Sequence, residues 1–220
     1  YISERKLTLV QISKMPQLLE IFEKEISDDA HDDITINTNE IKTLTTYFEH
    51  ITNAAGIANM YIVTAKGKIV YTLRDKELLG KKLTPNSKSE LLELYQAVDG
   101  AEVLRAPYLT KYYTANSMQK SRIFLSAPIL SNGKLKAVFV IRLDPRAIEA
   151  VVYRPSNIGQ FDETFLASLI DNQAAVVIHI KNGRNVTTLE STNPQILELL
   201  KRAARGESGE PTEVLKDGKQ

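Results

Sequence analysis

The side chains in this sequence best suited to hold a small molecule are tyrosines that gather between residues 103 and 113. Tyr108 follows Pro107, and Tyr112 and Tyr113 lie a short distance further along the chain. Large rings with a polar end, placed beside a packed sheet, are typical of small-molecule pockets. Such rings also serve to cover a hydrophobic core, and the residue types alone leave both interpretations open.

A β-hairpin is predicted directly after these tyrosines and would give them a sheet to lie against. Residues 122–130 and 135–143 are apolar runs separated by Ser131-Asn132-Gly133, and Asn-Gly between two such runs is a strong hairpin signal. The second run is almost continuously apolar over Ala137–Ile141, which favours a central strand covered on both faces. With residues 103–113 as a further strand, this part of the chain predicts three strands.

Composition excludes several other kinds of chemistry. The formal net charge is +1, which provides no basic field for binding nucleic acid or anionic lipid, so nucleic acid is not an expected partner. Cysteine is absent, which excludes disulfides, thiolate metal sites and cysteine nucleophiles. The sequence contains no nucleophile elbow and no Walker or dinucleotide phosphate loop. We therefore expect neither an enzyme nor a cofactor in this stretch of chain.

An acidic segment near the N-terminus offers carboxylates but not the pattern of a metal site. Residues 28–33 carry aspartates around His31, and their spacing is not that of a calcium loop. Charge runs commonly stay in water, so a solvated break between helices is the expected role. His50 and His179 are expected to be structural or exposed. No metal ligand is predicted.

Helices are predicted before the strands. Apolar residues across 2–26 recur mostly at three- and four-residue spacing, which is typical of an amphipathic helix, and Pro16 predicts a bend or break near its position. A second helical pattern covers residues 39–54, with Thr38 or Asn39 as its N-cap. The N-terminal region is therefore expected to be helical.

The order of the later elements predicts one α+β unit and the beginning of another. The first unit would contain strands at 57–64 and 68–73, a helix at 87–98 closed by Gly100, and the three strands described above. After a short helix that begins at Pro145, the second would contain strands at 164–171 and 174–180 and a helix at 194–204. Strand, strand and helix are repeated in the same order, which is a sign of internal duplication.

A series of motifs in these units resembles one family. MYIVTAKGKIVYTLRDKELLGKKL is followed by LLELYQAVDG, APYLT and IFLSAPILSNGKLKAVFVIRLD. They are similar, in this order, to the opening strands with their GKxL loop, the short helix, the Pro-Tyr strand and the closing hairpin of the Cache family of extracytoplasmic sensor domains. SNIGQFDETFLASLIDNQ resembles the start of the second module in double Cache domains. The resemblance covers nearly all of residues 39–220.

The resemblance implies an α+β fold with a long N-terminal helical region and two PAS-like antiparallel-sheet modules. We expect stalk helices at 1–55, a membrane-distal Cache module at 56–153 and a membrane-proximal one at 154–220 that is incomplete. The sequence begins at Tyr1 rather than methionine and stops at KDGKQ, which resembles the middle of a hairpin. We therefore expect it to be a fragment.

The family also implies a function. Its members are sensing domains of transmembrane receptors, such as histidine kinases, chemoreceptors or diguanylate cyclases, in a periplasmic or extracellular setting. A small-molecule ligand would bind the distal module, and the signal would pass through helices to a membrane reached by segments outside this chain. The N-terminal helices would also pair two copies into a homodimer. The alternative is a cytosolic PAS- or GAF-like regulatory module of a larger enzyme.

The residues of the family's amino-acid-binding branch are only partly present. There, the resemblance implies, an arginine and a tryptophan on the short helix hold the ligand carboxylate, and an aspartate two places after the Pro-Tyr tyrosine holds the amine. This chain keeps Tyr95 and Tyr108, but leucines replace the first pair and Thr110 stands where the aspartate would be. A buried charged ligand needs paired charges. We therefore predict that standard α-amino acids do not bind in that mode.

The polar side chains that remain around the expected pocket define the predicted ligand site. They are Tyr95, Arg105, Tyr108, Thr110, Tyr112, Tyr113, Arg122 and Ser126. Tyr108 is the first choice among them. Arg122 is suited to a bidentate pair with a carboxylate or phosphate, although a solvated charge at a strand end is the alternative role.

Overall fold

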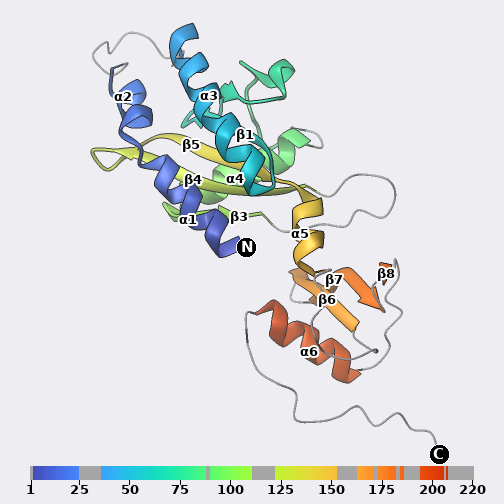
Figure 1. Cartoon of the computed structure of the whole chain (residues 1–220). Coiled ribbons are helices and arrows are strands. Elements are labelled where there is room, and N and C mark those ends of the chain that lie inside the picture. The colour runs from blue at the N-terminus through green and yellow to red at the C-terminus, as the bar shows by residue number, and fades with distance from the viewer. Residues whose placement is uncertain are drawn as a thin grey trace, which may run out of the picture. The chain divides into compact units, whose positions relative to one another are not determined.

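The structure is a computed structural model of the 220-residue chain (Figure 1). It describes residues 2–24, 36–87, 90–110, 122–152, 163–170, 173–181, 184–185, 194–205 and 207. The chain divides into two compact units, Tyr1–Val151 and Val152–Gln220. Each unit is described by itself below.

The first unit is built on a five-stranded antiparallel sheet. Its strands are β1 (Ile57–Thr64), β2 (Ile69–Thr72), β3 (Tyr108–Leu109), β4 (Ile123–Ser131) and β5 (Lys134–Leu143), in the spatial order β2-β1-β5-β4-β3. The predicted hairpin is confirmed, and its turn places Asn132 and Gly133 at φ of 51° and 72°, which suits an Asn-Gly turn. The strand β5 is central, as predicted, and Ala137–Ile141 is buried along its whole length.

Three helices precede the sheet: α1 (Ile2–Ser13), α2 (Pro16–Lys24) and α3 (Thr38–Ala55). The predicted break lies at Lys14 and Met15, and Pro16 opens α2, where its missing N–H costs little. The predicted N-cap of α3 is wrong by one or two residues. Asn37 is the cap, because its side chain accepts from the Glu40 N–H at 3.0 Å while the Glu40 carboxylate accepts from the Asn37 N–H at 3.1 Å.

The segment after β2 differs most from the prediction. A 3₁₀ helix, η1 (Lys76–Leu78), is followed by α4 (Glu90–Leu104), which runs through Gly100 instead of ending there. The expected strand over 103–113 is therefore wrong at its start, and within its described part, residues 103–110, β3 covers Tyr108–Leu109. A Cβ added at Gly100 would lie 2.5 Å from Cε1 of Tyr108, which is too close for non-bonded carbon atoms. Glycine is required there by packing and not by a helix end.

The two faces of this sheet are covered by different helices. Figure 1 shows α1 and α3 in front of the strands and α4 behind them. On the α3 face, the Phe48 ring packs against the rings of Tyr71 and Phe139 at centroid distances of 5.5 and 5.3 Å. On the α4 face, side chains of the helix and the strands form one core cluster. Its members include Tyr61, Val63, Leu94, Ala97, Ala101, Phe124, Val138 and Val140.

The second unit is smaller. The helix α5 (Pro145–Val152) leads to it, and it contains β6 (Glu163–Ile170), β7 (Gln173–Lys181), β8 (Arg184–Asn185) and α6 (Pro194–Ala204). These strands form an antiparallel sheet in the order β6-β7-β8, and α6 packs against β6 and β7. The predicted order of strand, strand and helix is present. The α+β prediction is confirmed for the described parts of both units.

Candidate functional site

The predicted site centres on Tyr108, which the structure places at the edge of the α4 face. Tyr108 lies in β3 and pairs with Ser126 of β4. Its half-buried ring packs over Gly100 of α4, at the place where any other residue would carry a Cβ. The ring thus joins the edge strand to the helix. Its predicted contact with a ligand stays a prediction.

Two of the predicted hydroxyl groups are used within the fold. The Ser126 hydroxyl lies 2.6 Å from the Ala97 carbonyl oxygen and 3.2 Å from that of Tyr108, and it donates to these acceptors. The Thr110 hydroxyl accepts from the Phe124 N–H at 2.9 Å and lies 3.2 Å from the carbonyl oxygen of the same residue. Both side chains are buried. They fasten β3 and α4 to β4, which is a role that residue type alone does not reveal.

The remaining predicted residues are spread around α4 and β4. The Tyr95 hydroxyl donates to the Asp99 carboxylate at 3.3 Å, and loss of hydration, followed by the negative charges of Asp99 and Glu102, raises the pKa of Tyr95 above 10.0. This hydroxyl therefore remains a donor at neutral pH. Arg105 is exposed just after α4, and Arg122 is half-buried just before β4. Tyr112 and Tyr113 lie outside the described residues.

The α4 face also carries a group of polar side chains that the sequence analysis missed. The Tyr61 hydroxyl donates to Oδ2 of Asp75 at 2.5 Å, and Nη1 of Arg142 contacts the same oxygen at 3.1 Å. We call these three residues the Asp75 cluster. The sequence carried one sign of this cluster, because the charged residue Arg142 interrupts an apolar strand. Strand alternation places Arg142 on the same face as Val140 and Val138.

The Asp75 cluster lies beside the core of the α4 face. The Tyr61 side chain is fully buried, and its ring centroid is 6.2 Å from that of Phe124. The side chains of Asp75 and Arg142 are each 20% exposed. This end of the face therefore combines a buried apolar core with charged groups that solvent still reaches.

Comparison with known proteins supplies the class of fold. No protein-family model matches the chain, and no curated protein matches it. Among solved structures, the sensor domain of the Vibrio cholerae histidine kinase DctB aligns with a TM-score of 0.51 and 16% identity over 96% of this chain and 71% of that one. The ligand-binding domain of the Pseudomonas fluorescens chemoreceptor CtaA, in complex with L-serine, aligns with a TM-score of 0.52 and 13% identity over 89% of this chain and 71% of that one.

The chain shares the fold of these two domains. This fold agrees with the family that the sequence motifs resemble. These two solved structures are a sensor domain and a ligand-binding domain. Among the described residues, no helix has both the length and the apolar character needed to cross a bilayer.

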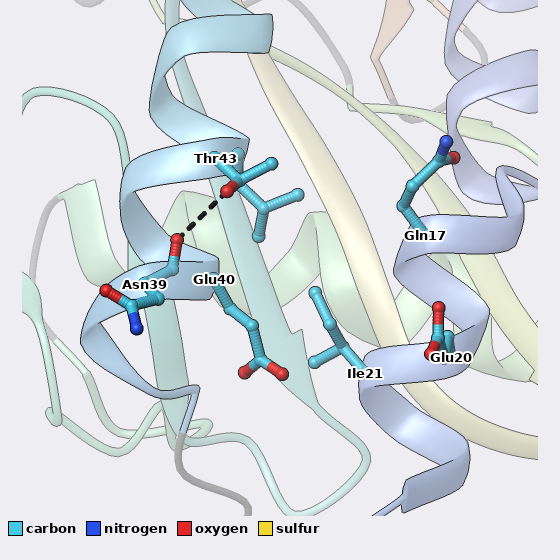
Figure 2. Close-up of a pocket in the computed structure, with 7 residues that line it drawn as sticks. Gln17, Glu20, Ile21, Asn39, Glu40 and Thr43 are labelled. Carbon is cyan, nitrogen blue, oxygen red and sulfur yellow. Dashed lines mark hydrogen bonds between the residues drawn. The ribbon is translucent and has the colours of Figure 1, made fainter.

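The first unit also contains a hollow on the other side of its sheet, between α2 and α3 (Figure 2). Its volume is about 220 Å³, and it is lined by Gln17, Glu20, Ile21, Asn39, Glu40, Thr43 and Leu44. Figure 2 shows the Glu40 carboxylate between the two helices, beside Ile21. This carboxylate already caps α3. The hollow is also smaller than the usual ligand pocket of about 300–1,000 Å³, so we regard it as a groove between helices.

Within the part of the chain that the structure describes, no group of three or more histidine, aspartate or glutamate side chains is arranged to hold a metal ion. The chemistry that the α4 face offers is instead hydrogen bonding and charge pairing beside an apolar wall.

Proposed function

We propose that this chain is the extracytoplasmic small-molecule-sensing part of a transmembrane signalling receptor. The observation that carries the proposal is the match of 96% of the chain to the sensor domain of a histidine kinase. The polar groups at the end of the α4 face support it. The receptor's output would be a histidine kinase, a chemoreceptor signalling region or a diguanylate cyclase.

The proposed organisation is a membrane-distal module at 56–153 and an incomplete membrane-proximal module at 154–220, with N-terminal helices at 1–55. The division of the chain near Val151 supports two modules. The N-terminal helices are also part of the first unit's core, because Leu9, Phe22 and Phe48 are fully buried in that unit. A change in the sheet would therefore reach these helices through direct packing.

Signal transfer would begin at the junction of α3 and β1. Gly56 ends α3 in the left-handed conformation, and β1 begins at the next residue. The Asp144 N–H donates to the Gly56 carbonyl at 2.9 Å, so the end of β5 is fixed to the same point. A ligand with different affinities for two arrangements of the sheet would shift their populations. The shift would move α3 and the start of α5 together.

A second copy of the chain is the proposed partner of the N-terminal helices. Leu7 of α1 and Tyr47 of α3 are 61% and 42% exposed, although apolar side chains of this size gain free energy when they leave water. Sedimentation equilibrium should show a dimer whose dissociation constant rises in Leu7→Glu. The exposed Leu130 on the β4 strand gives the control, since Leu130→Glu should leave the dimer intact. A monomer at all concentrations would contradict the proposal.

The sensing proposal is tested by a thermal-shift screen of small acids, amines and sugars on the purified chain. A ligand at about 100 times its dissociation constant stabilises the folded state by about 2.7 kcal/mol, which raises the melting temperature of a chain of this size by about 5–10 °C. No stabilisation by any class of compound would contradict the sensing proposal.

The predicted pocket residues are tested with the same ligand. Tyr108→Phe and Arg122→Ala should each reduce the ligand-induced shift. If both variants keep the full shift, the assignment of the pocket to Tyr108 is wrong, while the sensing proposal stands.

CtaA has been seen with L-serine, but the missing charged partners on α4 predict weaker amino-acid binding here. Calorimetry should find no standard α-amino acid that binds with a dissociation constant in the low-micromolar range or below.

A further inference from the structure

Six lysines gather at one end of the five-stranded sheet. They come from three segments of chain: residues 65–68 between β1 and β2, residues 79–84 after η1, and residues 130–136 at the β4–β5 turn. We call them the lysine end, and its members are Lys66, Lys68, Lys81, Lys82, Lys134 and Lys136. Lys68 and Lys136 are half-buried, and the other four are exposed.

Backbone contacts bring the three segments together. The Ala65 N–H donates to the Lys136 carbonyl at 3.1 Å, which joins the first segment to the third. Lys68 pairs with Lys82 in an antiparallel bridge, which joins the first to the second. The lysines thus lie on β5, beside β1, on the approach to β2 and on the segment that pairs there. With about 4.8 Å between neighbouring strands, the row is about 14 Å wide.

The charge of the lysine end is concealed by the composition of the whole chain. The three segments contain six lysines and no aspartate or glutamate, whereas the complete chain has a formal charge of +1. Lys81, Lys82, Lys134 and Lys136 form no ion pair with another described residue. A local positive field therefore exists on a nearly neutral protein, and such a field attracts negative partners.

The arrangement of these lysines works against the stability of the fold. Lys68 and Lys82 lie directly opposite each other across their bridge, and like charges in such positions are destabilising. Departures from the local rules of folding are typical of functional surfaces. A partner that carries negative charge would relieve the repulsion.

The residue types narrow the kind of partner. The three segments contain no arginine and no aromatic residue, so they lack the planar groups that bind phosphate in a bidentate way or stack on nucleic-acid bases. They also lack the tryptophan, tyrosine and arginine anchors of tight protein interfaces. Lysines are flexible point charges. Six of them spread over several strands suit a polymer with many negative groups better than one small anion.

The place of the lysine end in the first unit favours a polymer outside the membrane. Lys134 begins β5 and Leu143 ends it, so about 30 Å of strand separates the lysine end from the point where the chain leaves the sheet for α5 (Figure 1). In the proposed receptor the chain continues towards the membrane from that far end of β5.

We propose that the lysine end binds an acidic polysaccharide, whose carboxylates contact the lysine ammonium groups. The choice of a polysaccharide over a lipid surface rests on the proposed function, but the binding surface itself does not. The surface is separate from the Tyr108 region predicted to bind a small molecule. It would hold the first unit on an acidic glycan without occupying the sensing site.

The test measures binding of the purified chain to polygalacturonate by calorimetry, with neutral dextran for comparison. Wild type should bind polygalacturonate and not dextran, and the affinity should fall about tenfold or more between 50 and 200 mM salt. Lys81→Gln/Lys82→Gln and Lys134→Gln/Lys136→Gln should each lose about tenfold or more in affinity.

The control removes two positive charges elsewhere. Lys6 of α1 and Arg146 of α5 are exposed, and Lys6→Gln/Arg146→Gln gives the same net charge as either lysine-end variant. This control should keep the wild-type affinity. An equal loss in the control would mean that net charge alone attracts the polymer, and that result would overturn the inference. Absence of binding by wild type at 50 mM salt would overturn it as well.

A single variant separates binding from folding. Lys82→Glu places an opposite charge across from Lys68, so its melting temperature should equal or exceed that of wild type, while its affinity for polygalacturonate should fall further than in Lys82→Gln. A loss of affinity in a chain that is at least as stable cannot come from unfolding. Unchanged affinity in Lys82→Glu would contradict the inference.

Two exposed leucines decide between a polysaccharide and a lipid surface. Leu79 and Leu130 belong to the same segments and are 46% and 38% exposed, and leucines beside lysines also suit a bilayer surface. Leu79→Gln/Leu130→Gln should keep the affinity for polygalacturonate. If wild type instead prefers phosphatidylglycerol vesicles and these changes abolish that binding, the partner is a lipid surface and the inference fails.

Failure of this inference is distinguishable from failure of the sensing function. All of these variants should keep the melting-temperature shift that a small molecule from the wider screen produces. The sensing proposal fails only when no compound of that screen binds, whatever the result with polygalacturonate. Loss of the small-molecule shift in the lysine variants would show that the lysine end belongs to the sensing site, which would also contradict the inference.

Discussion

The two faces of the five-stranded sheet differ in the side chains that they carry. On the α3 face, Phe48, Tyr71 and Phe139 pack ring against ring. A hydrogen bond of 3.2 Å joins the hydroxyls of Thr45 and Tyr71 there. The α4 face has an equally apolar centre but ends in the Asp75 cluster. The comparison shows that one face of the sheet is filled by packed rings, whereas the other ends in hydrogen-bonded and charged side chains that solvent reaches.

The largest effect is expected from a cavity on the α3 face. Phe139 is fully buried in the central strand, so Phe139→Ala should lower the free energy of unfolding by about 3–5 kcal/mol, as measured by urea denaturation. Ligand affinity should not change at temperatures where the variant is folded. The exposed Leu130 provides the control, because Leu130→Ala should cost far less. A loss below about 1 kcal/mol for Phe139→Ala would contradict the assignment of this face to stability.

A smaller effect is expected at the contact of Gly100 and Tyr108. Alanine is favoured over glycine by about 1 kcal/mol in a helix interior, yet Gly100→Ala should destabilise the chain by about 1–3 kcal/mol, because the new methyl group overlaps the Tyr108 ring. Tyr108→Ala should remove this penalty in the double variant. The double-mutant cycle should therefore show strong coupling, and additive effects would mean that the ring does not lie over Gly100.

A modest gain is expected where α4 ends. Arg105 has a φ of 50°, a conformation that costs a non-glycine residue about 1–2 kcal/mol and that glycine adopts freely at helix ends. Arg105→Gly should raise the free energy of unfolding by about 0.5–1 kcal/mol. Because Arg105 was also predicted to line the ligand site, the same variant measures its role in binding. Unchanged affinity together with higher stability would remove Arg105 from the site.

The smallest effect concerns pH. Burial raises the pKa of Tyr71 above 10.0, although its hydrogen bond to Thr45 acts in the opposite direction. The folded state therefore holds this proton more tightly than the unfolded state, and the resulting stability is fully present below about pH 10. This stability is lost as the pH rises through the pKa that Tyr71 has in the folded state. Unfolding free energies should fall more steeply above pH 10 in wild type than in Tyr71→Phe, and parallel curves would contradict this.

Local sequence signals predicted the elements whose causes are local. The β4–β5 hairpin follows from Asn132-Gly133 between two apolar runs, and the break before α2 follows from Pro16. The N-cap of α3 was misplaced although a signal existed. Asn37 and Glu40 have the spacing of a capping box, and weighing this spacing would have selected Asn37 over its two neighbours.

Features that depend on distant contacts could not be predicted in the same way. Gly100 resembles a helix end, but the ring of Tyr108 requires glycine at that point inside α4. The Asp75 cluster joins Asp75 to residues 14 and 67 positions away. Strand alternation marks Arg142 as unusual, but no local pattern encodes its pairing with Asp75. Of the predicted site, Ser126 and Thr110 lie near Tyr108 as expected, but their hydroxyls serve the packing of β3 and α4.

The most direct test of the difference between the two faces is a backbone-amide NMR titration of the chain with the best ligand from the screen. The account predicts that the shifted resonances cluster on the α4 side, around Gly100, Tyr108 and Ser126. Shifts that cluster instead around Gln17 and Glu40, in the groove between α2 and α3, would contradict it.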